Sequence, residues 1–125
     1  MLHSHTTEKI IKAFYTVYNT LGHGFLEKVY ENALMIELQK LGLHPGQQQK
    51  ISVYYAGQPV GQYFADIVVD DRVIIELKAA EALREEHKAQ LTNYLKATDR
   101  EVGLLLNFGK SPEFKRVIFT NDRKR

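Results

Sequence analysis

The stretch that decides the fold is residues 63–78, YFADIVVDDRVIIELK. It contains two apolar runs, rich in the β-branched residues that favour strands, on either side of a polar turn at residues 70–72. Charge interrupts the first run only at Asp66, and the second only at Glu76 and Lys78. A buried carboxylate without a partner is costly, so these groups need a counter-charge, a bound cation or a raised pKa.

The length of the turn decides whether the three charged side chains meet. If residues 70–72 form a three-residue loop, counting outward along the two strands places Asp66 directly opposite Glu76. Lys78 then shares their face, because side chains alternate with a period of two. A two-residue loop would send the acids to opposite faces. We predict the three-residue loop, built on a type I turn with a bulge.

Such a pair of acids predicts a cation site. Two carboxylates whose Cβ atoms lie roughly 5 Å apart repel each other unless a divalent cation is present. Oxygen ligands suit Mg²⁺ or Mn²⁺, and a chain without cysteine offers only oxygen or histidine donors. Lys78 would lie beside a bound water, where its charge could stabilise a phosphate under attack.

Hydrophobic spacing predicts an α/β (α+β) fold with the order ααβββαββ, a mixed sheet flanked by helices. The expected elements are a helix capped by Thr6 and Thr7 and ending at Leu21, a helix over 26–41, strands over 50–55, 60–69 and 73–78, a helix over 83–98, and strands over 102–106 and 117–119.

Composition is that of an ordinary globular protein. With 125 residues, 44% of them hydrophobic and 26% charged, we expect a single domain over residues 1–125. No apolar run is long enough for a membrane span and the N-terminus does not resemble a signal peptide, so we expect a cytoplasmic location. A net charge of +2 permits a nucleic-acid partner without requiring one.

Basic residues gather near the C-terminus, at Lys110, Lys115, Arg116, Arg123, Lys124 and Arg125. They could bind phosphates, although a solvated tail explains residues 123–125 equally well.

Asp66, Glu76 and Lys78 on a hairpin resemble the signature of the PD-(D/E)XK nuclease superfamily, with Ala65 in place of the proline. Residues 24–30, GFLEKVY, match the motif that names the GxxExxY family of that superfamily. Residues 90–94, QLTNY, resemble the QxxxY motif of RecB-like nucleases, and residues 102–109 are also similar to this family. The resemblance therefore covers nearly the whole chain in order.

The resemblance implies a restriction-endonuclease-like core and a Mg²⁺ or Mn²⁺ site formed by Asp66 and Glu76, with Glu27 on the preceding helix as an additional acidic ligand. Helical spacing places Glu27 on the core side of its helix. Glu37 lies on the same stripe, so periodicity cannot single out Glu27. We favour a helix-end salt bridge for Glu37, with membership of the site as the alternative.

Gln90 completes the expected catalytic set of Glu27, Asp66, Glu76, Lys78 and Gln90. Gln90 and Tyr94 are four residues apart and share a helix face. Tyr94 could hydrogen-bond a phosphate, or it could be a core aromatic with a solvated hydroxyl, and the same two interpretations apply to Tyr30.

The favoured hypothesis is a metal-dependent nuclease acting on nucleic acid, with DNA as the expected polymer. The alternative is a catalytically silent module that keeps the fold and binds nucleic acid or protein. A third, weaker hypothesis is an enzyme that uses the same metal centre on another phosphate substrate. The second hypothesis is motivated by size: a domain of 125 residues carries no obvious extra substrate-recognition element, so a homodimer or a partner protein could be needed to hold a duplex.

Overall fold

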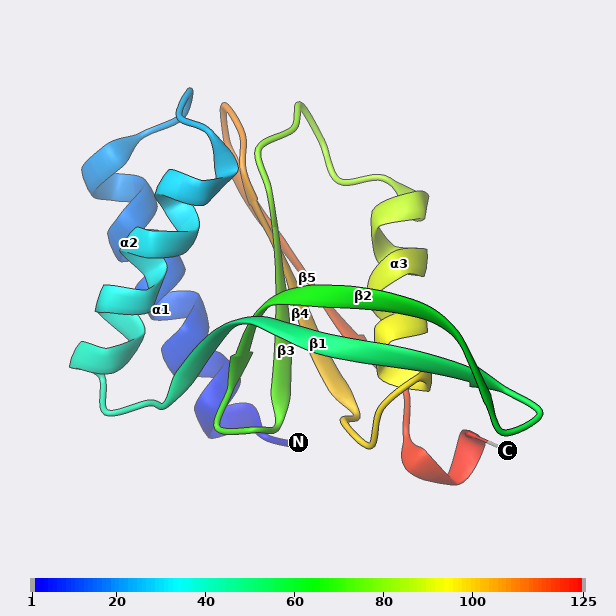
Figure 1. Cartoon of the computed structure of the whole chain (residues 1–125). Helices are drawn as coiled ribbons and strands as arrows, with labels where there is room; N and C mark the ends of the chain where they lie inside the picture. The colour runs from blue at the N-terminus through cyan, green and yellow to red at the C-terminus, as the bar shows by residue number, and fades with distance from the viewer. Residues whose placement is uncertain (1, 125) are drawn as a thin grey trace.

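The computed structural model of the chain describes residues 2–124 and has the predicted order of elements. Two helices, three strands, one helix and two strands follow each other along the chain (Figure 1). Their bounds are α1 Ser4–Leu21, α2 Glu27–Lys40, β1 Pro45–Tyr55, β2 Gln58–Val69, β3 Val73–Lys78, α3 Glu85–Lys96, β4 Val102–Phe108 and β5 Pro112–Ile118, followed by the short 3₁₀ helix η1 Asn121–Arg123.

The five strands form one mixed sheet in the order β1-β2-β3-β4-β5. Neighbouring strands are antiparallel except β3 and β4, which are parallel because α3 carries the chain back between them. Helices α1 and α2 cover one face of the sheet and α3 covers the other (Figure 1). The far half of the β1–β2 hairpin extends beyond β3 toward α3 (Figure 1).

Alternation along the strands builds one apolar core on each face. Ile75 and Leu77 of β3 pack toward α1 and α2, whereas Ile74 packs toward α3. Period 2 therefore assigns Glu76 and Lys78 to the α3 face, where the second core is smaller.

The predicted register of the central hairpin is confirmed. Val69 pairs with Val73 and Ile67 with Ile75, which leaves three residues in the loop. The predicted turn type is wrong, because Asp70 and Asp71 both have positive φ, at 51° and 56°, as in a type I′ turn. The backbone twist of a type I′ turn matches the right-handed twist of the two strands that it joins, whereas a type I turn would force these strands apart.

The ends of several elements differ from the sequence prediction. Helix α1 begins at Ser4, and Thr7 lies buried within it and donates its hydroxyl to the Ser4 carbonyl at 3.0 Å, so the predicted threonine cap is wrong. Strand β1 begins at Pro45, five residues before the prediction, and β5 occupies Pro112–Ile118. These segments are polar or exposed, so hydrophobic spacing does not detect them.

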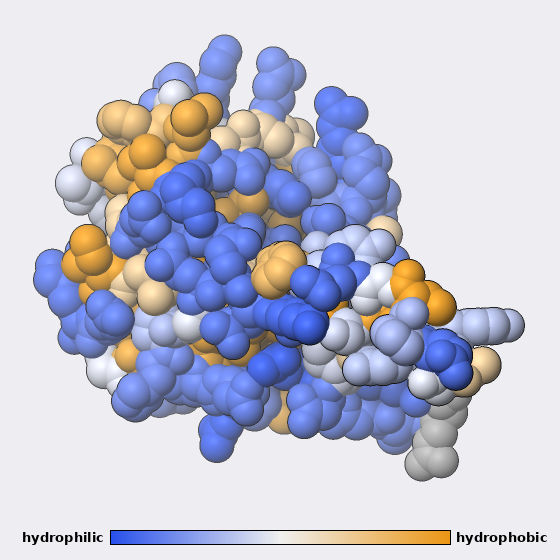
Figure 2. All heavy atoms as spheres, in the orientation of Figure 1, coloured by the Kyte–Doolittle hydropathy of each residue, from blue (hydrophilic) through white to orange (hydrophobic). Residues whose placement is uncertain are grey.

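Within residues 2–124, no helix has the length and apolar character needed to cross a bilayer. Exposed large apolar side chains gather in two places, at the start of α2 (Phe25, Leu26 and Val29) and at the free end of the β1–β2 hairpin (Tyr54, Tyr55 and Val60). Figure 2 shows the first of these as an apolar patch at the upper left of the view.

Candidate functional site

The site is built where β2 and β3 separate. Their backbone pairing stops at Ile67 and Ile75, and side-chain carboxylates continue it. Glu76 Oε2 accepts a hydrogen bond from the Asp66 backbone N–H at 2.7 Å, and Asp66 Oδ2 accepts one from the Leu77 N–H at 2.8 Å. Each acid is therefore fixed by the opposite strand, and the register derived from the sequence brings Asp66 and Glu76 together.

Both acids are disfavoured as anions in this position. Glu76 is 4% exposed, and burial followed by the charge of Asp66 raises its pKa to about 8, against the opposing effects of the Asp66 N–H and Lys78. Burial also raises the pKa of Asp66, although its hydrogen bond from Leu77 acts in the opposite direction. Two neighbouring acids with so little access to solvent are costly to ionise together. A divalent cation would stabilise their ionised forms by neutralising the two charges.

The second oxygen of each acid is not committed. Within the described part of the chain, Asp66 Oδ1 and Glu76 Oε1 form no hydrogen bond. These hard oxygen donors fit Mg²⁺ or Mn²⁺, and Mg²⁺ is commonly held by one or two carboxylates together with waters and substrate phosphates. Asp66 and Glu76 would hold the ion.

Glu27 comes near this centre without joining a preformed set of three acids. Its Oε2 accepts a hydrogen bond from the Ala79 N–H at 3.3 Å, at the end of β3. Among residues 2–124, no group of three or more His, Cys, Asp or Glu side chains is arranged to hold a metal ion. Glu27 is exposed beside the loop that follows Lys78, so the predicted core-side position is wrong, because the buried face of α2 begins at Tyr30. Its role as a ligand stays a prediction.

Lys78 and Gln90 are brought together from β3 and α3. Lys78 Nζ donates to Gln90 Oε1 at 3.4 Å, so the amide fixes the amine from the helix side. Lys78 is half-buried and extends from the same face of β3 as Glu76. An amine held in this way can meet a phosphate oxygen beside the two acids.

Tyr94, one turn after Gln90, is close enough to the two acids for their charges to act on its hydroxyl. Its ring centre is 5.6 Å from that of Tyr63 on β2. Burial, followed by the charges of Glu76 and Asp66, raises the pKa of Tyr94 to about 12. Like any tyrosine hydroxyl, that of Tyr94 is protonated at neutral pH and can donate a hydrogen bond to an anion, and the raised pKa extends this to more alkaline pH.

Tyr30 is placed in the other core, against the helices. Its ring is fully buried and stacks on Phe108 with 4.3 Å between ring centres. Its hydroxyl donates to the Gly22 carbonyl at 2.6 Å and accepts from the Phe25 N–H at 3.2 Å. These contacts close the loop between α1 and α2, so the structure does not bring Tyr30 together with Asp66 and Glu76, and its predicted contact with substrate gains no support.

Glu31 is a buried acid that the sequence interpretation missed. The side-chain amides of Gln47 and Gln48 donate to its two oxygens at 2.6 and 3.1 Å, and Lys28 Nζ lies 3.0 Å away. Gln48 reaches it from a left-handed backbone conformation, φ 51°, where it leaves the β1–β2 ladder. The charge of Glu31 is one of the lesser causes of the raised Asp66 pKa. Because both amides come from β1, spacing along α2 gives no signal for this role.

The chain that leaves the site after Lys78 is held in place by β4. The Asn107 side chain accepts from the Ala80 N–H and donates to the Ala80 carbonyl, both at 2.9 Å. A Cβ at Gly109 would lie 2.4 Å from that same carbonyl oxygen, so glycine is required there. These contacts fix the exit of β3, on which the position of Lys78 depends.

Two charged residues outside the site, Glu37 and Lys124, form structural contacts. Glu37 forms the expected helix-end salt bridge with Lys40 at 3.2 Å. Lys124 donates to the carbonyls of Thr98 and Arg100 at 3.0 and 2.6 Å, so it secures the C-terminus. The last residue of the basic cluster, Arg125, lies outside the described residues.

Comparison with known proteins defines the family. A family model described as the PD-(D/E)XK nuclease superfamily matches residues 4–117, and the chain therefore belongs to this superfamily. No protein with a curated description matches. Among solved structures, the crystal structure of SSO0001 is similar in fold, with a TM-score of 0.58 and 18% identity. The match covers 94% of this chain but 59% of that one.

Proposed function

We propose that this protein is a metal-dependent nuclease that hydrolyses phosphodiester bonds of nucleic acid, with DNA as the expected polymer and Mg²⁺ or Mn²⁺ as cofactor. The observation that carries the proposal is the pair formed by Asp66 and Glu76, each fixed by a backbone N–H of the opposite strand, with Lys78 on the same face. Membership of the superfamily supports the same class of reaction. The motif at residues 24–30 supports assignment to its GxxExxY family.

The chain's own residues have distinct roles in this reaction. Asp66 and Glu76 would hold the cation, and Glu27 would add an acidic group beside them. When bound, the metal supplies positive charge to the scissile phosphate and lowers the pKa of a bound water. Lys78, positioned by Gln90, orients the attacking water and stabilises the charge that develops on phosphate.

Tyr94 supplies a neutral donor at the same place. A phenol is protonated at neutral pH, and the raised pKa of Tyr94 extends this to more alkaline pH. The hydroxyl can bind a non-bridging phosphate oxygen without adding charge. Glu76 is buried and Asp66 half-buried, and interactions between charges are stronger there than at an exposed surface.

The test is cleavage of plasmid, single-stranded DNA and RNA in the presence of Mg²⁺ or Mn²⁺. We expect Asp66→Asn, Glu76→Gln and Lys78→Met each to lower the rate at least a hundredfold, whereas Glu8→Gln, an exposed acid on α1, leaves it unchanged. Metal-dependent cleavage that persists in all three site variants would exclude this centre.

A catalytically silent binding module is the second candidate. It is favoured by one observation, namely that the described residues do not contain a preformed set of three acids. Binding of nucleic acid that needs no metal and is unaffected by Asp66→Asn, together with no cleavage of any polymer, would support this candidate over the nuclease.

A further inference from the structure

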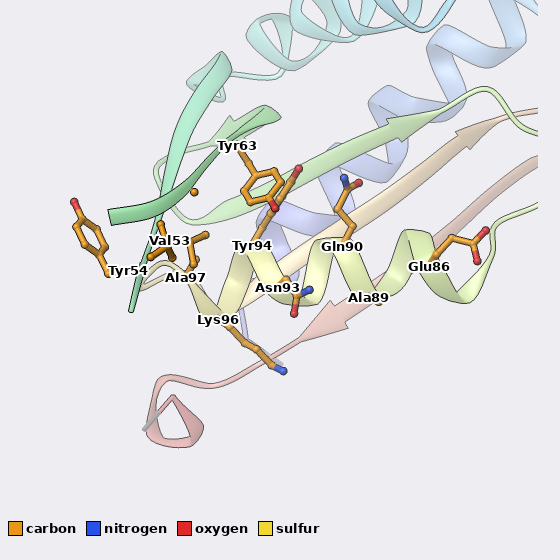
Figure 3. A pocket seen from close by; sticks show the side chains of 12 residues that line it. Val53, Tyr54, Tyr63, Glu86, Ala89, Gln90, Asn93, Tyr94, Lys96 and Ala97 are labelled. Atoms are coloured by element: carbon orange, nitrogen blue, oxygen red, sulfur yellow. The ribbon is translucent and has the colours of Figure 1, made fainter. Parts of the chain in front are cut away.

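A groove lies between α3 and the free half of the β1–β2 hairpin, beside the two acids. It has a volume of about 830 Å³, which falls within the range of roughly 300–1,000 Å³ that is usual for ligand sites. One wall is formed by the hairpin, through Val53, Tyr54, Val60, Gly61 and Tyr63. The other wall is formed by α3 and the residue after it, through side chains between Glu86 and Ala97. Figure 3 shows the rings of Tyr63 and Tyr94 together near the middle of the groove, with Tyr54 at one end.

The groove is continuous with the candidate active site. Gln90 and Tyr94 line it, and Gln90 also accepts the hydrogen bond from Lys78 at 3.4 Å. Tyr94 in turn contacts Tyr63, with 5.6 Å between ring centres. A polymer whose phosphate lies against Lys78 would therefore have its neighbouring nucleotide at the mouth of the groove.

The walls are aromatic and nearly free of charge. Glu86 and Lys96 are the only charged residues among those that line the groove, and Lys96 Nζ lies over the Phe119 ring, 5.3 Å from its centre. Proteins grip a duplex mainly through lysine and arginine on its phosphates. Single strands are held both by basic groups on their phosphates and by aromatic side chains on which bases stack, and only the stacking contact requires unpaired bases. This chemistry favours unpaired bases over a duplex.

We propose that the groove holds unpaired bases of single-stranded nucleic acid, with the adjoining phosphate at Asp66, Glu76 and Lys78. The inference rests on the proposed nuclease function and names its preferred substrate form. Tyr54 is 64% exposed and Tyr63 49% exposed, so both rings have a free face for stacking. The Asn93 side-chain amide in the same wall can hydrogen-bond a base edge.

Binding of a fluorescently labelled twelve-nucleotide oligothymidylate, measured by anisotropy, tests the inference. All proteins are full chains that carry Glu76→Gln and are measured in EDTA, so that cleavage during the measurement is negligible. Tyr54→Ala and Tyr63→Ala are expected to weaken binding about tenfold, which is about 1.4 kcal/mol and within the contribution of one stacked base. Tyr54→Phe and Tyr63→Phe are expected to bind like the parent, because they retain the rings.

Tyr55 provides the matched control. It is next to Tyr54 at the same hairpin end and is 76% exposed, but it does not line the groove. Tyr55→Ala should bind the oligonucleotide like the parent, and the parent should bind the same sequence less tightly when it is paired in a duplex. Thermal unfolding of each variant shows whether the protein is still folded. If Tyr63→Ala proves unstable, the result for Tyr54→Ala, at the exposed end of the hairpin, decides the test.

Unchanged binding in both alanine variants, or tighter binding of the duplex than of the single strand, would overturn the inference. An equal loss in Tyr55→Ala would also overturn it, because it would point to the hairpin as a whole and not to the groove. Failure of the nuclease proposal has a different signature, which is the absence of metal-dependent cleavage by the wild-type chain. That result leaves the stacking measurements as they are.

Discussion

Substitution of Glu76 by glutamine should stabilise the metal-free protein at neutral pH. Glu76 is buried, and its anion is disfavoured first by burial and then by the charge of Asp66. Glutamine has the same shape without the charge, and its carbonyl oxygen can still accept the hydrogen bond from the Asp66 N–H. The variant therefore removes an electrostatic penalty and keeps the contact.

The pKa of Glu76 sets the size and the pH window of this effect. Its pKa in the folded protein is about 8, against an ordinary value of 4.5, so between these pH values the folded state keeps a proton that the unfolded chain loses. The stability of the wild-type protein therefore falls as the pH rises from 4.5 to 8. At pH 7 the free energy of unfolding is lower by about 3 kcal/mol than it would be without the shift, because each pH unit above 4.5 lowers it by about 1.4 kcal/mol.

Thermal unfolding in EDTA at several pH values measures this penalty. We expect Glu76→Gln to raise the Tm by roughly 10 °C relative to wild type at pH 7, and to have little effect at pH 4.5. Glu8→Gln, at an exposed position, should change nothing at either pH. A difference between Glu76→Gln and wild type that does not depend on pH, or a loss of stability at pH 7, would refute the reasoning.

Three further substitutions test other parts of the account. Lys78→Arg should retain charge but lose at least tenfold in cleavage rate, since a guanidinium cannot replace an amine held by Gln90; a rate equal to wild type in a plasmid assay would contradict this. Gly109→Ala should cost about 1–3 kcal/mol in urea unfolding, because its Cβ would lie 2.4 Å from the Ala80 carbonyl oxygen. Tyr30→Phe should cost about 1–2 kcal/mol by losing its buried hydroxyl bonds, with the cleavage rate unchanged; a lower rate in the folded variant would restore Tyr30 as a substrate-binding residue.

The central hairpin could be predicted because two local rules determine it. The length of the loop at residues 70–72 sets the register, and the period of two in strands then assigns Asp66, Glu76 and Lys78 to one face. The order of helices and strands follows equally from apolar spacing, and the sheet confirms it. Gln90 could be placed near Lys78 only through the resemblance, because their contact joins β3 to α3 across the fold.

Other parts of the site depend on distant contacts that no local pattern encodes. Glu31 is fixed by Gln47 and Gln48, which reach it from β1. Gln48 does so from a left-handed backbone conformation, which the sequence does not indicate because the residue is not a glycine. The aromatic groove arises because the β1–β2 hairpin extends past β3 and faces α3 (Figure 3). Tyr63 and Tyr94 are 31 positions apart in the sequence, and only the fold brings their rings together.

Calorimetric titration of Mn²⁺ into the wild-type protein and into Asp66→Asn is the most direct test of the central claim that Asp66 and Glu76 form one cation site. We expect wild type to bind one Mn²⁺ per chain and to release protons at pH 7 as Glu76 ionises, and we expect the variant to bind at least tenfold more weakly. Equal Mn²⁺ binding by the two proteins, or no binding by wild type, would contradict it.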